Sequence, residues 1–110
     1  MLRLTAGLSL FFFAAITACE TTGPDAATII VDNRGNRKVT VYISKCSDDT
    51  WGSSRGSVGD HEEKPFKVDP GCWDMQAAWT SSCHSEQRGQ ELGPMEVYRF
   101  VVEDPGDFCD

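Results

Sequence analysis

Four of the five cysteines lie beyond residue 45, where their spacing could support either a metal site or disulfides: Cys46, Cys72, Cys83 and Cys109. The intervals are 26, 11 and 26 residues, so no C-x-x-C pair occurs and the pattern does not match a zinc ribbon or finger. An even number of cysteines in a short exported domain is typical of a disulfide framework. We therefore predict two disulfides, no metal ion and no cofactor.

The pairing of these cysteines depends on the directions of the predicted strands, and four cysteines allow three connectivities. If the long loop 47–63 crosses from one end of the domain to the other, Cys46 and Cys72 lie together at one end. Cys83 and Cys109 then lie at the opposite end. If the loop stays at one end, Cys72 is left about 25 Å from any partner, although a disulfide needs Cα atoms within about 7 Å. We favour Cys46–Cys72 and Cys83–Cys109, while a C-terminal tail that folds back leaves other pairings open.

The candidates for acid–base or metal chemistry are two histidines and two acidic segments. His61 lies in a polar loop and His84 follows a cysteine in a predicted turn, and either imidazole could act as a base near neutral pH. The acidic segments 60–63 and 103–110 offer oxygen ligands of the kind that calcium prefers, but without EF-hand spacing. The chain contains no H-E-x-x-H metal-site motif and no paired-carboxylate signature. We therefore expect solvated histidines, an acidic solubilising surface, and a protein that is not an enzyme.

Two features could form a binding surface. Trp51 lies in the polar, glycine-rich stretch 47–63, where its indole ring could stack on a sugar or a peptide or could plug the end of the fold. Three basic residues, Arg34, Arg37 and Lys38, lie at a predicted turn and could contact phosphate or lipopolysaccharide; the alternative is a solvated turn. These four side chains are the candidate binding residues.

The elements that must position these residues are short strands separated by turns. Alternation is clearest in 72–79, where Trp73, Met75 and Trp79 share one face, as expected of the buried side of a sheet, and polar residues occupy the other. Pro65 cannot donate a ladder hydrogen bond, so its strand is expected to lie at a sheet edge or to begin at this residue. Strands are predicted at 28–33, 38–44, 64–68, 72–79 and 95–103, with a weaker one within 85–92.

The turns between these strands favour an antiparallel fold. The segment 33–37, NRGNR, carries the Asn and Gly typical of a hairpin turn, so strands 28–33 and 38–44 are expected to pair directly. The stretch 47–63 is expected to be a long surface loop. Repeated short strands with Gly/Pro turns predict an all-β fold, a small antiparallel β-sandwich of about six to seven strands.

The pattern of residues 1–18 predicts an export signal. Arg3 supplies a positive charge and residues 4–16 form an apolar run. The run is too short to cross a bilayer of roughly 30 Å, although an uncleaved anchor helix is the alternative reading. An ordinary secreted protein with a free thiol near its N-terminus is a further alternative.

The run ends in Ile16-Thr17-Ala18-Cys19, which resembles the bacterial lipobox. In that family the cysteine receives a diacylglycerol, the signal is cut before it, and the new amine is acylated. The resemblance implies a lipoprotein whose mature chain is 19–110, held stably by two or three acyl chains. Residues 19–27 are then the lipidated cysteine and a short tether, and 28–110 are the β-sandwich domain with an acidic tail.

The layout of residues 28–103 resembles a group of small exported bacterial β-sandwich domains. That resemblance implies the fold and no established activity. Its landmarks here are Asn33, Tyr42, Trp51-Gly52, Pro70-Gly71 and Trp73-Asp74.

The net charge limits the class of partner. The chain carries 17 acidic and 10 basic residues, giving −7, and removal of the signal with Arg3 gives −8. Such a domain is repelled by nucleic acid and by anionic lipid surfaces. The covalent lipid on Cys19, and not electrostatic attraction, must therefore hold it at the membrane. By resemblance to enterobacterial lipoproteins, Glu20 in place of the aspartate that retains proteins at the inner membrane implies the periplasmic face of the outer membrane.

The sequence predicts a non-catalytic interaction module of the cell envelope, which binds an envelope protein or a glycan. The alternative is an inhibitor or immunity lipoprotein that blocks an envelope-active hydrolase or toxin. A compact acidic domain would suit a basic target of that kind.

Overall fold

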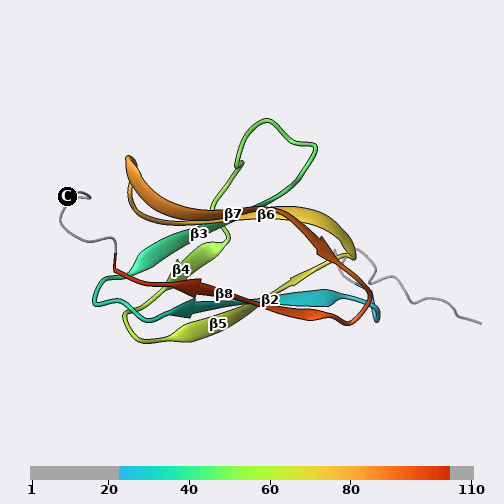
Figure 1. Cartoon of the computed structure of the whole chain (residues 1–110), viewed down its shortest axis with the longest axis horizontal. Helices are drawn as coiled ribbons and strands as arrows, with labels where there is room; N and C mark the ends of the chain where they lie inside the picture. Colours follow the sequence, from blue (N-terminus) through green and yellow to red (C-terminus); the bar gives the residue numbers. More distant parts are fainter. Residues whose placement is uncertain (1–22, 105–110) are drawn as a thin grey trace, which may run out of the picture.

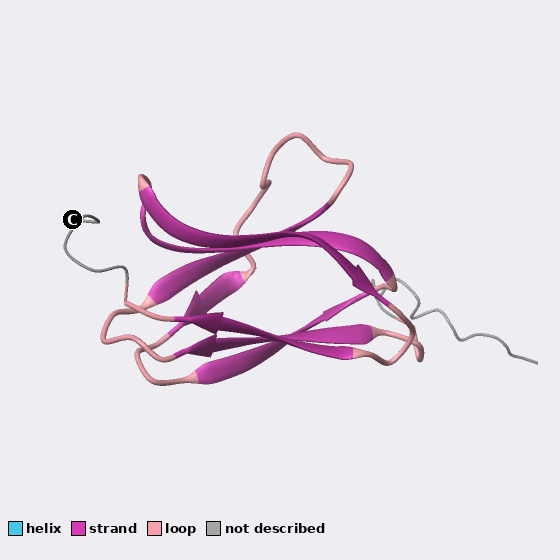
Figure 2. Cartoon of the chain, viewed as in Figure 1, coloured by secondary structure: helices cyan, strands magenta, loops and turns pink. Residues whose placement is uncertain are grey.

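The structure, a computed structural model, describes residues 23–104, which form seven strands in two facing sheets (Figures 1 and 2). One sheet has the order β5-β2-β8 and the other β4-β3-β6-β7. The predicted all-β sandwich is therefore confirmed. Within the described range, no helix is long and apolar enough to cross a membrane. The strands are β2 (Ala27–Asn33), β3 (Val39–Lys45), β4 (Gly56–Val58), β5 (Glu63–Val68), β6 (Gly71–Thr80), β7 (Cys83–Leu92) and β8 (Val97–Val102).

The chain reverses direction at every connection between strands, so β2 and β8 run the same way. They are also neighbours in the three-stranded sheet, and they therefore pair in parallel, with Ile29 opposite Tyr98. The other pairings in both sheets are antiparallel. The expectation of a purely antiparallel sandwich thus holds except at this one pair.

The core lies between the two sheets and is built from alternate residues of each strand. Met75 and Ala77 of β6 are fully buried, Trp73 is 7% exposed, and Trp79 packs partly buried against the same cluster. This confirms the predicted buried face of 72–79. The opposite sheet contributes the inward residues of β2 and β8, which are Ala27, Ile29, Val31, Phe100 and Val102.

The NRGNR segment does not form the predicted hairpin, because β2 and β3 belong to different sheets. The buried side chain of Asn33 holds this crossover in place: its Nδ2 donates to the carbonyls of Arg37 (2.8 Å) and Gly59 (3.0 Å). Nδ2 also lies 3.3 Å from the carbonyl of Val58, and Oδ1 accepts from the Gly35 amide at 3.0 Å. The amide thus fastens the β2–β3 connection to the β4–β5 connection.

The stretch predicted as one long loop contains the short strand β4, which pairs with the start of β3. Val58 of β4 is fully buried and adds to the core. Pro65 lies in β5, which pairs only with β2 within the described sheet, so the predicted edge position is confirmed.

Candidate binding site

The disulfide Cys46–Cys72 is present, as predicted, with its Cα atoms 5.4 Å apart. It continues the β3–β6 ladder, because Lys45 lies opposite Trp73 and the Cys46 amide donates to the Cys72 carbonyl at 3.1 Å. The bridge therefore fixes the base of the β3–β4 loop, which carries Trp51.

The other cysteine predictions fall wholly or partly outside the described residues. Cys83 is buried and disulfide-bonded, but Cys109 lies beyond residue 104, so the pairing Cys83–Cys109 stays a prediction. Cys19, the predicted lipid site, also lies outside the described range.

The outer face of the four-stranded sheet contains buried polar side chains. Asp74 and Gln76 point away from the core, as the alternation in β6 predicts, yet they are only 5% and 7% exposed. The β3–β4 loop projects from this side of the sandwich (Figure 1), and its Trp51 ring lies over Arg88 of β7, with the guanidinium carbon 4.8 Å from the ring centroid. An arginine under an indole face makes a favourable cation–π contact. Trp51 is thus half-buried and held against the sheet.

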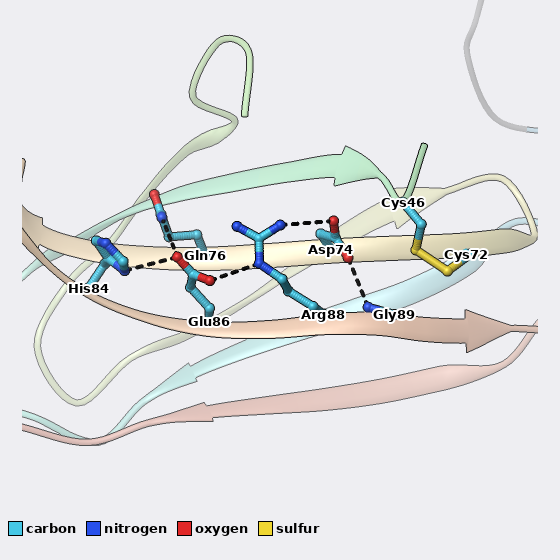
Figure 3. Close-up of polar contacts among 8 residues, drawn as sticks. All are labelled: Cys46, Cys72, Asp74, Gln76, His84, Glu86, Arg88 and Gly89. Atoms are coloured by element: carbon cyan, nitrogen blue, oxygen red, sulfur yellow. Dashed lines mark hydrogen bonds and ion pairs between the residues drawn. A yellow bond between two sulfur atoms is a disulfide. The ribbon is translucent and has the colours of Figure 1, made fainter. Parts of the chain in front are cut away.

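A β-bulge in β7 aims Arg88 at this position. The register shifts between Trp73 and Met75, so that Arg88 and Gly89 both lie opposite Asp74. Gly89 has φ +69°, a conformation that favours glycine. The Asp74 carboxylate accepts from the Gly89 amide at 2.8 Å and pairs with Arg88 Nη1 at 3.4 Å, as Figure 3 shows. Asp74 therefore stabilises the bulge and orients the cation.

Glu86 connects the neighbouring polar groups (Figure 3). Its carboxylate accepts from Arg88 Nε at 2.9 Å and Gln76 Nε2 at 3.1 Å, and it lies 3.2 Å from His84 Nδ1. Partial burial alone would raise the pKa of Glu86. The hydrogen bonds from Arg88 and Gln76, with the charges of Arg88 and His84, outweigh it and lower the pKa below its ordinary 4.5.

Neutralising Glu86 should make the stability less dependent on pH. A lowered pKa means that the carboxylate stabilises the fold above pH 4.5, and that this contribution is lost as the pH falls through the folded-state value. Glu86→Gln should therefore lower the free energy of unfolding by about 0.5–1 kcal/mol at pH 7 and have a smaller effect at pH 3. Urea unfolding at both pH values measures this. Glu91→Gln, at an exposed position on the same strand, is the control, and equal effects of the two variants at both pH values would contradict the assignment.

Trp51 separates two shallow depressions on this face. One, of about 400 Å³, is bordered by Trp51, Tyr42, Trp79 and the amide of Gln76. The other, of about 370 Å³, is bordered by Trp51, Ser44 and Arg55. The first depression is also lined by the polar residues Thr40, Thr80 and Ser81. It therefore combines three aromatic residues with hydrogen-bonding groups, a composition suited to a sugar ring or an extended peptide.

The three basic candidates are not part of this site. Arg34, Arg37 and Lys38 lie on the β2–β3 connection and border neither depression beside Trp51. Arg34 Nε is 3.1 Å from Asp32 Oδ2, so its charge is already paired. The structure therefore does not bring the four predicted binding residues together.

The outer-face residues Asp74, Gln76, Glu86 and Arg88 were not recognised from the sequence as part of a site. One signal was available, because an isolated glycine within a strand, here Gly89, indicates a bulge.

The histidines lie apart from one another. The predicted turn position of His84 is wrong. His84 belongs to β7, because this strand begins at Cys83 and is therefore longer than the strand expected within 85–92. His61 is exposed, with Nδ1 3.7 Å from Asp60. Over residues 23–104, no three His, Cys, Asp or Glu side chains are grouped so that they could hold a metal ion. Most of the acidic segment 103–110 lies outside the described residues.

No protein-family model matches the chain, and no curated protein matches its sequence significantly. The functional argument therefore depends on the geometry of the Trp51 face, defined as Trp51, Tyr42, Trp79, Gln76 and Arg88.

Proposed function

We propose that this chain is a lipid-anchored protein of the bacterial cell envelope, on the outer membrane, whose sandwich is a non-catalytic binding module. The signal-like segment 1–18 and the lipobox-like residues 16–19 support the anchor. The observation that carries the binding role is the position of Trp51, half-buried over Arg88 on a loop whose base is closed by a disulfide. A ring fixed in this way loses little conformational freedom when a ligand stacks on it.

The ligand class follows from the groups around that ring. Tyr42, Trp51 and Trp79 line the depression as its aromatic residues. Gln76, Thr40 and Thr80 also line it and provide polar groups that can select an orientation. Saccharide rings and extended peptides both present the required combination of apolar faces and hydrogen-bonding oxygens. An envelope glycan or an envelope protein is therefore the partner that we propose.

The anchor and the binding role are tested with one soluble variant. Cys19→Ser should lose labelled fatty acid and leave the membrane fraction, and retention of both would contradict the anchor. The oxidised Cys19→Ser protein is then immobilised, and solubilised envelope extract and purified cell-wall glycan are passed over it in moderate salt. We expect one ligand to be retained in a defined stoichiometry.

The binding face is tested in the same assay. Adding Trp51→Ala should weaken retention by roughly 5- to 150-fold, because stacking on an aromatic ring is worth on the order of 1–3 kcal/mol. Asp49→Asn, in the same loop, exposed and bordering neither depression, should have no effect. Retention that survives Trp51→Ala, or no retention at all, would contradict the proposal. If the retained protein is a hydrolase whose lysis activity the domain blocks, the inhibitor role replaces the general binding role.

A further inference from the structure

The turn between β7 and β8 holds a methionine in a conformation that favours glycine. The Glu96 amide donates to the Gly93 carbonyl at 3.2 Å, which closes a four-residue turn with Pro94 and Met95 at its centre. Met95 has φ +62°, and the second central position of a turn of this kind normally holds glycine or asparagine. Packing of the side chain does not offset the backbone strain at Met95, because this residue is 71% exposed. Strained residues of this kind are often kept for function.

The turn tip is apolar and lies beside the start of the described chain. Val97, two residues further on, is 60% exposed. The Met95 amide donates to the Asp25 carbonyl at 3.0 Å, and the Thr28 amide donates to the Glu96 carbonyl at 2.8 Å. Figure 1 shows the β7–β8 turn and the beginning of β2 at the same end of the sandwich. The two exposed apolar side chains are therefore at the end from which the chain leads back to Cys19.

The distance from that end to the proposed lipid is short. Only three residues separate Cys19 from Gly23, the first described residue. A chain spans at most about 3.6 Å per residue, so Gly23 lies within about 14 Å of Cys19 whatever the path between them. Lipid on Cys19 would hold the turn close to the headgroup layer.

We propose that Met95 and Val97 form a second membrane contact, in which the turn tip enters the boundary between headgroups and acyl chains of the bilayer that holds the Cys19 lipid. This inference rests on the proposed lipid anchor. The anchor keeps the tip at a high effective concentration near the surface, so a small apolar area is sufficient. Asp25 and Glu96 flank the tip, so the contact is hydrophobic and not an attraction to anionic lipid. It would orient the sandwich, with the β7–β8 turn facing the membrane.

Methionine-methyl NMR tests this contact with an internal control. The expected mature chain 19–110 contains only Met75, which is fully buried, and Met95. Cys19 is coupled to a maleimide lipid in phosphatidylcholine bicelles, so the test does not depend on acylation in the cell. Failure of lipidation in the cell would then count against the anchor alone. A nitroxide carried on the lipid should broaden the Met95 signal beyond detection and leave Met75 unchanged. A soluble gadolinium chelate should broaden Met95 only in the unanchored Cys19→Ser protein, and equal broadening in the anchored protein would overturn the proposal.

A substitution at the tip separates membrane contact from folding. Met95→Asn suits the positive φ and keeps the turn, so the melting temperature should stay the same or rise. In the anchored protein with Met95, the lipid nitroxide should also broaden the Val97 amide signal, and in Met95→Asn this broadening should be lost. Val101→Thr, a polar replacement of similar shape further along the same strand face, should leave that effect intact. Persistence of the effect in Met95→Asn would overturn the role of the methionine.

Discussion

Replacing Cys46 and Cys72 together by alanine should lower the free energy of unfolding by about 3.5 kcal/mol and the melting temperature by roughly 15–25 °C. The bridge joins residues 26 positions apart, and closing a loop of that length restricts the unfolded chain by about this much. A domain of this size has a total stability of only about 5–15 kcal/mol. The loss therefore removes a large share of it. Urea and thermal unfolding followed by circular dichroism measure both quantities.

The double replacement leaves no new free thiol at this site, so the comparison is with the oxidised wild type. Ser81→Ala, at an exposed turn position, is the control for an ordinary surface substitution. The variant should also release the base of the β3–β4 loop, which would weaken the stacking of Trp51 on Arg88 and change the tryptophan fluorescence of the native state. A melting temperature equal to that of the wild type would show that the bridge is not structural.

Truncation of Asn33 to alanine should lower the free energy of unfolding by about 3 kcal/mol, because it removes several buried hydrogen bonds at once. The side chain is fully buried and bonds the crossover through both its nitrogen and its oxygen. Without it, the carbonyls of Arg37 and Gly59 and the amide of Gly35 lose these partners. Buried polar groups left without a partner are costly. Urea unfolding at neutral pH measures the change.

Asn36→Ala is the matched control, since Asn36 lies in the same connection but is exposed. Its backbone amide donates to Asp104 Oδ1 at 2.8 Å, a bond that the substitution preserves. We expect a change within about 0.5 kcal/mol for this variant, as for most surface positions. Equal effects at the two positions would show that the amide of Asn33 does not hold the crossover.

The sandwich and one disulfide could be predicted because they depend on patterns within single strands and on strand direction. Alternation in 72–79 predicts which side of β6 faces the core, and the direction of each strand places Cys46 next to Cys72. The crossover at 33–37 could not be predicted in the same way. Asn and Gly mark a hairpin turn and a sheet-to-sheet connection equally well. The partners of Asn33 that distinguish the two lie about 25 residues further along the chain.

The candidate site was less predictable than the fold, because it depends on one loop covering one sheet face. Alternation predicts that Asp74 and Gln76 point to solvent, and they do point away from the core. Their burial comes from their surroundings on the outer face, where Trp51 stacks on Arg88. That contact joins two residues 37 positions apart (51 to 88), and no local pattern specifies it.

The parallel pairing of β2 and β8 has a mechanical consequence. The two strands lie side by side and run the same way over six residue pairs, from Thr28 opposite Val97 to Asn33 opposite Val102. A pull on the chain before β2 and an opposite pull on the chain after β8 would act along these strands. The load would be shared as shear by the whole row of interstrand hydrogen bonds, which could not open one after another from an end. A domain held by the chain before β2 would thus resist extension when the chain after β8 is pulled away.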